Sequence, residues 1–151
     1  MTPLAAARGL RLDYAAAPAV LSPLFPLARR ELQNLVGTLL TVLGLERCTL
    51  GLTLVDDAGV AALNQRFLNC SGPTNILSFP EGDADRPDEL GALFLSVETL
   101  AREAFLYGQE PREHLARLLA HGLLHLAGHD HGVEMDTLTE LAVSCVLAPP
   151  A

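Results

Sequence analysis

His-Gly-Leu-Leu-His-Leu-Ala-Gly-His-Asp-His, residues 121–131, holds four of the five histidines in the chain. His121 and His125 are four residues apart, so an α-helix would place both imidazoles on one face, about 6 Å apart along its axis. Gly128 can adopt a positive φ and end that helix, and the chain can then turn back and bring His131 to the pair. Three imidazoles that converge on one point are the ligand set of a catalytic zinc, with a fourth position open to water.

The remaining histidines leave alternatives open. His129 could replace His131 as the third ligand, although it follows Gly128 directly and has little room to turn back. His114 would lie two turns before His121 on nearly the same side of the helix, and we expect it at the rim or the surface. Unrelated histidines are a further alternative, but buried imidazoles without a shared partner are costly. Nickel, copper and iron also accept imidazole, so the pattern predicts a metal and favours zinc.

Acidic residues near the histidines could support the ligands. A ligating imidazole normally donates its second N–H to a carboxylate or a carbonyl, and we expect Asp130 and Glu134 in that role. Gly122 stands where HExxH proteases carry their general-base glutamate, and it has no side chain that can accept a proton. The metal would therefore activate water with help from another group or from a phosphate of the substrate, which argues against a peptidase.

Hydrophobic periodicity predicts one α+β domain over residues 1–151, a mixed sheet of about four strands with about five helices packed on it. The expected strands are 9–14, at a sheet edge, 47–55, 75–79 and 90–96, the last two paired as a hairpin. The expected helices are 27–43, 58–67, 98–107, 111–126 and 136–147. Leucines cover most of the circumference of the fourth helix, which is typical of a buried helix. The metal site should therefore lie on the central buried helix.

The second expected helix, 58–67, can be described in more detail. Asp57 precedes it and is the expected N-cap, because a short acidic side chain can accept a hydrogen bond from a free backbone N–H. Val60, Leu63 and Phe67 recur at helical spacing and should face the interior. Residues 69–74, Asn-Cys-Ser-Gly-Pro-Thr, follow and have the composition of a loop.

The cysteines and the absence of long apolar segments indicate a cytoplasmic protein. The three cysteines are odd in number and form no Cys-x-x-Cys pair, which argues against disulfides and against a thiolate metal site. We expect reduced thiols, with Cys48 and Cys145 in the core. No apolar stretch reaches the ~18 residues of a membrane helix, and the N-terminus lacks the regions of a signal peptide. We therefore expect a soluble, unexported protein without a membrane partner.

The formal charge of −8 bears on the choice of partner. All ten basic residues are arginines. An acidic chain is a poor candidate for sequence-independent binding of nucleic acid, which needs clustered cations. Five of the nine residues from 81 to 89 are acidic, and such a run is usually a solvated loop. Contact with nucleic acid would therefore need a local basic patch.

Two segments resemble the YbeY family, bacterial endoribonucleases of ribosomal RNA maturation. Residues 121–131 resemble that family's HGxLHLxGYDH signature, and residues 73–80, Pro-Thr-Asn-Ile-Leu-Ser-Phe-Pro, are similar to its PTDVLSFP segment. Leu63-Asn64 and Leu90-Gly91 stand where the family has an LN pair and the start of its LGDI region. The resemblance covers roughly residues 46–147.

This resemblance implies both a metal and a reaction. By position, His121, His125 and His131 would hold one Zn²⁺ in an α+β metalloprotein. The implied activity is that of a single-strand-specific endoribonuclease, which acts in maturation of the 3′ end of small-subunit rRNA and in ribosome quality control. The implied partners are single-stranded RNA, including rRNA, and the small ribosomal subunit.

Several positions depart from the family pattern. Leu68 stands where the family has an arginine that matters for activity. Arg66, two residues earlier, is the candidate to steady the phosphate. A shift of two positions along a helix, however, directs a side chain to a different side. Basic residues give way to Cys70 and Gly72, and PTD, GDI and GYD become PTN, GAL and GHD through Asn75, Ala92 and His129. Each lost cation removes phosphate affinity or charge stabilisation. Two alternatives to the nuclease remain: a non-catalytic, zinc-stabilised binding module in ribosome assembly, and a metallohydrolase that acts on another substrate, such as a peptide.

Overall fold

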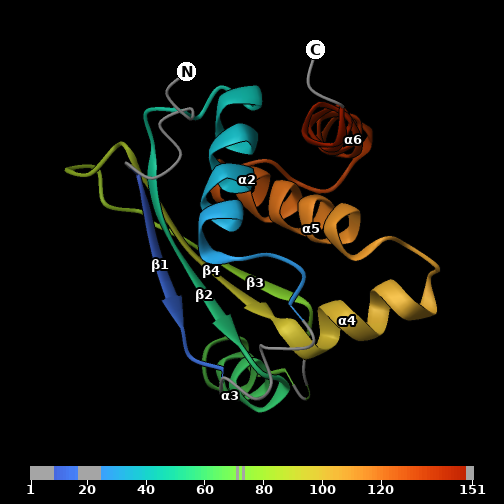
Figure 1. Ribbon diagram of the computed structural model, residues 1–151. Helices are drawn as coiled ribbons and strands as arrows, with labels where there is room; N and C mark the ends of the chain where they lie inside the picture. The colour runs from blue at the N-terminus through green and yellow to red at the C-terminus, as the bar shows by residue number, and fades with distance from the viewer. Residues whose placement is uncertain (1–8, 17–24, 71, 73, 149–151) are drawn as a thin grey trace.

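The computed structural model describes residues 9–16, 25–70, 72 and 74–148 (Figure 1). Within these ranges the chain forms four strands and five helices in the order β-α-β-α-β-β-α-α-α, as predicted. The strands are β1 (Leu10–Tyr14), β2 (Thr49–Val55), β3 (Ile76–Pro80) and β4 (Glu89–Ser96). The helices are α2 (Arg29–Val42), α3 (Asp57–Leu68), α4 (Val97–Leu106), α5 (Pro111–Leu126) and α6 (Val133–Leu147).

The sheet is mixed and has the strand order β1-β2-β4-β3. β1 runs parallel to β2 and β2 runs parallel to β4, whereas β3 pairs with β4 in the antiparallel sense. The predicted edge position of the first strand and the pairing of the last two are therefore confirmed. β3 forms the opposite edge of the sheet.

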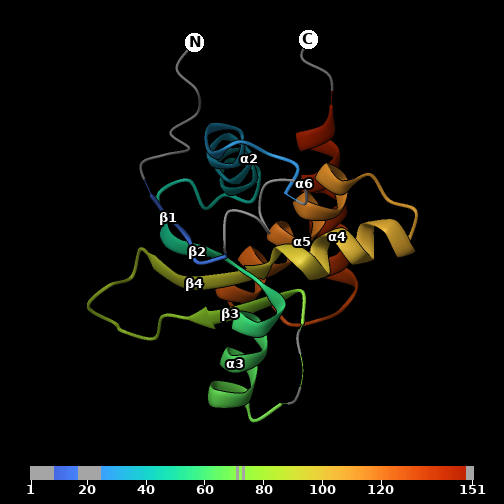
Figure 2. The same cartoon turned by 60° about the horizontal axis from the view of Figure 1, so that its bottom comes forward.

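Helices cover both faces of the sheet. α2, α5 and α6 lie on one face, and α3 lies on the other (Figure 2). α5 contacts β3 and β4 beneath it and α2, α4 and α6 around it. Its side chains Leu115, Leu119 and Leu123 are at most 1% exposed. The helix that carries the first two histidines of the cluster is thus buried at the centre of this layer, as its leucine pattern predicts.

α3 differs from its prediction at both ends. Asp56 rather than Asp57 is the N-cap, because its Oδ1 accepts a hydrogen bond of 2.7 Å from the backbone N of Gly59. Asp57 instead accepts a hydrogen bond of 2.6 Å from Oγ1 of Thr99 and so joins α3 to α4. Phe67, expected to face the interior, is 55% exposed. The short helix buries only its middle against the sheet and leaves its last turn at the surface.

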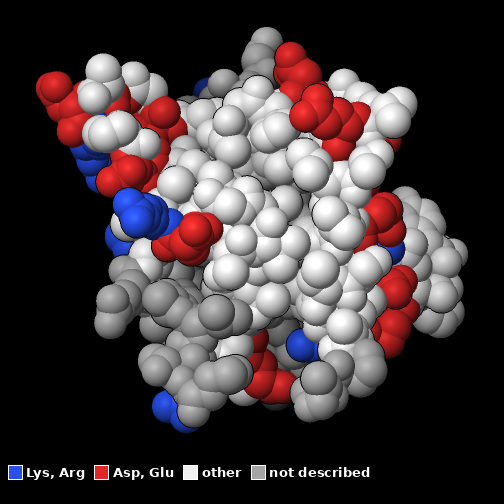
Figure 3. Space-filling model, turned by 90° about the horizontal axis from the view of Figure 1, so that it is seen from above, with Lys and Arg blue, Asp and Glu red and all other residues white. Residues whose placement is uncertain are grey.

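Glu89 corrects the prediction of a solvated loop over residues 81–89. It begins β4, is 8% exposed, and accepts two hydrogen bonds of 2.8 Å from the guanidinium of Arg11 on β1. These bonds, against the opposing effect of burial, lower the pKa of Glu89 to about 2. The rest of the run, 81–88, is an exposed loop. Its acidic side chains gather on the lobe at the left of Figure 3, the side on which Figure 1 shows the β3–β4 loop.

Two smaller predictions also need correction. Cys145 is exposed rather than in the core, because the buried face of α6 runs through Met135, Thr139, Ala142 and Val143; Cys48 is partly buried. α6 begins at Val133 rather than at 136, since the carbonyl of Gly132 accepts a hydrogen bond from N of Asp136 and closes a first turn there. Among the described residues, no helix combines the length and the apolar character that crossing a membrane requires.

Candidate metal centre

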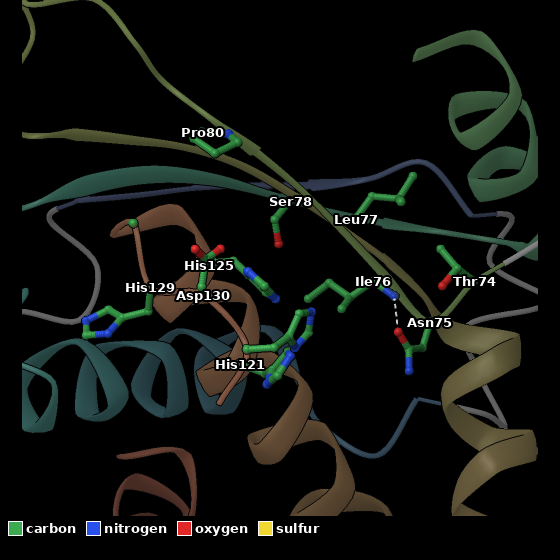
Figure 4. Close-up of a pocket in the computed structure, with 12 residues that line it drawn as sticks. Thr74, Asn75, Ile76, Leu77, Ser78, Pro80, His121, His125, His129 and Asp130 are labelled. Atoms are coloured by element: carbon green, nitrogen blue, oxygen red, sulfur yellow. Dashed lines mark hydrogen bonds between the residues drawn. The ribbon is translucent and has the colours of Figure 1, made fainter. Parts of the chain in front are cut away.

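α5 presents His121 and His125 one turn apart on the side that faces β3 (Figure 4). Pro111 opens the helix, where a missing N–H is harmless, and the side chain of Glu110 caps it. The centroids of the two imidazole rings are 4.8 Å apart, and both side chains are partly buried. The spacing of four residues therefore produces the stacked pair that it predicts.

Gly122 lets α5 approach the sheet between the two histidines. A Cβ at this position would lie 3.0 Å from Cδ1 of Ile76 and 3.0 Å from Cδ2 of Leu93, which is tighter than ordinary van der Waals contact. A side chain as large as glutamate must therefore displace the ends of Ile76 and Leu93. A general base at this position is disfavoured by packing, and the glycine itself cannot act as one.

The segment after α5 brings His131 back to the pair. Gly128 has a φ of +98°, and its N–H donates to the carbonyl of His125 at 3.0 Å, so the helix ends where the sequence predicts. The ring centroid of His131 lies 5.2 Å from that of His121 and 4.6 Å from that of His125. His129 points away from the other labelled histidines in Figure 4. The structure thus brings His131, and not His129, into the cluster.

The three histidines fit a metal ion as a donor set. One ligand nitrogen of each lies within 4.8 Å of the others, so all three can turn toward one ion, and imidazole nitrogen is a ligand that zinc accepts. Burial lowers the pKa of His121 and of His125, and neighbouring imidazoles lower both further. Neutral imidazole is the form that binds a metal, so the site favours the binding-competent state.

The two acidic residues expected to support the ligands differ in their position relative to the cluster. Asp130 lines the same cavity as the histidines, and its charge acts to raise the pKa of His125. Glu134 is exposed on the first turn of α6. The charge of Asp136, on the same turn, acts to raise the pKa of His121. No local pattern in the sequence marks Asp136 as part of the site. Within the described ranges no hydrogen bond joins Asp130 or Glu134 to an imidazole, so their supporting role stays a prediction.

The histidines form one wall of a cavity of about 600 Å³ (Figure 4). β3 and the residues before it form the facing wall, so the two segments that carry the family resemblance meet at one place. The described residues that line the cavity are Thr74, Asn75, Ile76, Leu77, Ser78, Pro80, His121, His125, Gly128, His129, Asp130 and His131. Residues with hydroxyl and amide side chains therefore share this lining with the imidazoles, and the lining contains one carboxylate and no arginine.

Asn75 is held at the cavity by a partly buried hydrogen-bond network. Its Nδ2 donates to Oε1 of Glu103 at 3.1 Å, and its Oδ1 accepts from N of Ile76 at 2.7 Å. The same Oε1 lies 3.0 Å from Nε2 of His114, which is only 5% exposed. The prediction that His114 is a rim or surface residue is therefore wrong, because α4 packs over this part of α5. No local signal marks Glu103, which lies eleven residues from His114 on another helix.

Arg66 lies outside the cavity. It belongs to α3, and its Cζ is 5.0 Å from the ring centroid of Phe67. Leu68, where the resemblance leads one to expect arginine, is 49% exposed on the same helix. The structure does not bring Arg66 to the histidines, so a role for it in catalysis stays a prediction.

Comparisons with known proteins agree with both motifs. The chain matches the family model described as Endoribonuclease YbeY over residues 26–142. A protein named Endoribonuclease YbeY from Oleidesulfovibrio alaskensis is 42% identical over 148 residues, which cover 84% of this chain and 88% of that protein. One of the same name from Nitratidesulfovibrio vulgaris is 45% identical over 141 residues, covering 82% and 87%. The match to the family model takes in α2, which the two motifs alone do not reach.

A solved structure shares this fold. The solution structure of a Thermotoga maritima protein superposes with a TM-score of 0.59 and covers 91% of this chain and 88% of that chain. The two sequences are 23% identical. This likeness concerns the arrangement of helices and strands alone.

Proposed function

The chain belongs to the YbeY family, and from that premise we propose that it is a zinc-dependent endoribonuclease that cuts single-stranded RNA. The proposed substrate is rRNA, at the 3′ end of the small-subunit species during maturation and in ribosome quality control, in the cytoplasm. Residues 1–151 would form the one domain that carries this activity. The observation that carries the proposal is the cavity that three imidazoles line together with the polar residues Thr74, Asn75 and Ser78.

The proposed ligands of one Zn²⁺ are His121, His125 and His131. Bound zinc supplies an electrophile for a phosphoryl oxygen and a water whose pKa is lowered toward neutrality. Asp130 is the one carboxylate among the described lining residues. It is therefore the best-placed side chain to orient an imidazole or to accept a proton, because Gly122 can do neither.

The facing wall would bind the RNA backbone through neutral donors. The hydroxyls of Thr74 and Ser78 line the cavity and can donate hydrogen bonds to phosphate oxygens. Such contacts position a phosphate without the strong, salt-dependent attraction of a cation. The chain should therefore bind RNA weakly through this cavity and cut it slowly, unless other surfaces add affinity.

A cleavage assay with metal control tests the proposal. The purified chain is stripped with a chelator, reloaded with zinc, and mixed with a single-stranded RNA and with the same RNA in a duplex. We expect the zinc-loaded chain to cut the single strand in preference to the duplex, and the stripped chain to cut neither. Cleavage that continues at the same rate in the stripped chain would contradict a metal-dependent mechanism.

One feature favours a second function, a non-catalytic, zinc-stabilised module for binding to the small ribosomal subunit. The cavity lining contains no arginine among its described residues, and the neighbouring loop 81–88 is acidic, so the charge stabilisation expected of a nuclease is reduced. This function predicts that the zinc-loaded chain sediments with small-subunit particles and leaves every RNA intact. The same cleavage assay separates the two functions.

A further inference from the structure

A second pocket lies on the face of the sheet opposite to α5. It has a volume of about 260 Å³ and is lined by Leu63 and Phe67 of α3, Phe79 of β3 and Phe94 of β4. The three phenyl rings form a continuous edge-to-face row, with centroid distances of 5.6 Å from Phe67 to Phe79 and 5.7 Å from Phe79 to Phe94. Phe67 is 55% exposed, so this row is accessible from solvent.

A cation stands beside this aromatic row. The guanidinium carbon of Arg66 lies 5.0 Å from the ring centroid of Phe67, and the Arg66 side chain is exposed. The described lining of the pocket itself is wholly apolar. An apolar pocket with a positive charge beside one of its rings matches a ligand with a flat apolar body and an attached anion. A nucleotide has both, because its base has a π-face and its phosphate is negative.

The aromatic pocket shares one strand, β3, with the cavity lined by the three histidines, which is called the metal cavity here. Ser78 and Pro80 line the metal cavity, while Phe79, between them in sequence, lines the aromatic pocket. Successive side chains of a strand point to opposite faces of the sheet, and β3 is an edge strand. A single polynucleotide strand that crosses this edge could therefore contact both sites.

We propose that the pocket lined by Leu63, Phe67, Phe79 and Phe94 binds a nucleobase of single-stranded RNA, while Arg66 contacts the adjacent phosphate. This inference rests on the proposed function, since it takes RNA as the substrate. The pocket holds the base by stacking, and its apolar lining provides no hydrogen bond that would select one base, so binding is tolerant of sequence. Leu68 replaces an arginine of the family pattern, and Arg66 on the same helix compensates in part for the lost phosphate contact, at a place away from the metal.

Fluorescence can test the pocket without reference to cleavage, because the chain contains no tryptophan. Phe67→Trp introduces a single reporter at an exposed aromatic position. The zinc-loaded variant, residues 1–151, is titrated with a 2′-O-methylated single-stranded oligonucleotide, shown on a gel to remain intact. We expect the tryptophan emission to be quenched by this oligonucleotide and unchanged by an abasic one of the same length. Equal quenching by both, or quenching only by an apolar peptide, would overturn the proposal.

Affinity provides a second measurement with matched controls. Phe67→Ala should raise the Kd for the oligonucleotide about tenfold, since one stacked base is lost. Phe105→Ala, at a phenyl ring that is 86% exposed on α4, should leave the Kd unchanged. Arg66→Ala should reduce the slope of log Kd against log salt by about 0.7, the value for one phosphate of a single strand. Arg30→Ala, at an exposed arginine of α2, should not change the slope.

The outcomes separate this inference from the proposed function. If Phe67→Ala and Phe105→Ala bind with the same Kd, the pocket does not bind a base, whether or not the wild-type chain cuts RNA. If Phe67→Ala weakens binding and the zinc-loaded wild type cuts nothing, the pocket stands and the nuclease proposal fails.

Discussion

Glu103 and His114 form a largely buried contact between α4 and α5, with Oε1 of Glu103 3.0 Å from Nε2 of His114. The same oxygen accepts a hydrogen bond from Asn75, which lines the metal cavity. One carboxylate therefore connects the helix that carries the candidate ligands to the segment that faces them. The two walls of the cavity are held in register by this contact.

Loss of His114 should loosen that connection. His114→Ala leaves the Glu103 carboxylate with fewer partners and opens a void beside it, so we expect the free energy of unfolding to fall by about 2–3 kcal/mol. Urea unfolding at pH 7 measures this change. His129→Ala, at a histidine outside both the cluster and the network, is the control and should change stability by less than about 0.5 kcal/mol. Equal stability of the two variants would mean that the network does not hold the cavity walls.

Introduction of a protease-like base at position 122 should fail. Gly122→Glu forces a charged side chain against Ile76 and Leu93, where a Cβ alone would already lie at 3.0 Å, and we expect a loss of stability of about 3 kcal/mol or more. Ala62→Glu adds the same side chain at an exposed position of α3 and should be nearly neutral. Thermal unfolding of both variants checks this. A stable Gly122→Glu chain that hydrolyses peptides would contradict the steric argument.

Stability should depend on pH through Glu89. Its pKa falls from 4.5 to about 2 on folding, chiefly because Arg11 donates hydrogen bonds to it. A lowered folded-state pKa adds stability that is complete above about pH 4.5 and is lost as the pH falls toward 2. Because Arg11 is half exposed, we expect Glu89→Gln to reduce stability by about 1–2 kcal/mol at pH 7 and by much less at pH 2.5.

Urea unfolding at both pH values measures the effect of Glu89→Gln. Asp85→Asn, in the exposed loop next to it, is the matched control and should have little effect at either pH. If Glu89→Gln lowers the free energy of unfolding as much at pH 2.5 as at pH 7, the charge of Glu89 is not the source of its stabilising effect.

Metal occupancy should also depend on pH, and it should fall as the pH falls and the imidazoles take up protons. Protons and the metal compete for the same ring nitrogens, and burial lowers the pKa of His121 and of His125 below 6.5. We expect full occupancy at pH 7 and progressive loss below about pH 6. Metal analysis after dialysis at pH 7, 6 and 5 measures this, with circular dichroism to confirm that the chain stays folded. Full metal content at pH 5 would argue against a three-histidine site of ordinary affinity.

The sequence predicts the centre of the site well, because its determinants are local. Two histidines on one helical face, followed by a glycine that ends the helix, fix three side chains within eleven residues. The leucine pattern of α5 predicts its burial for the same reason. These features depend on helix geometry, which the sequence spacing expresses directly.

The parts that the sequence does not predict depend on contacts between distant segments. Glu103 reaches His114 only because α4 folds over α5, and Phe67 meets Phe79 across the gap between α3 and the sheet. The sequence offers two neighbouring aspartates as the N-cap of α3 and does not distinguish them. Asp56 is the cap, and the side chain of Asp57 instead bonds to Thr99 of α4. Such choices are decided by packing, which local patterns do not contain.

The central claim, that His121, His125 and His131 hold the metal on which RNA cleavage depends, is tested most directly by metal analysis of three chains. Wild type, His125→Ala and His129→Ala are purified in parallel, analysed for bound metal and assayed on single-stranded RNA. We predict about one zinc per chain and RNA cleavage for wild type and for His129→Ala, and neither for His125→Ala. Cleavage by His125→Ala without metal, or loss of metal from His129→Ala with retention in His125→Ala, would contradict this account.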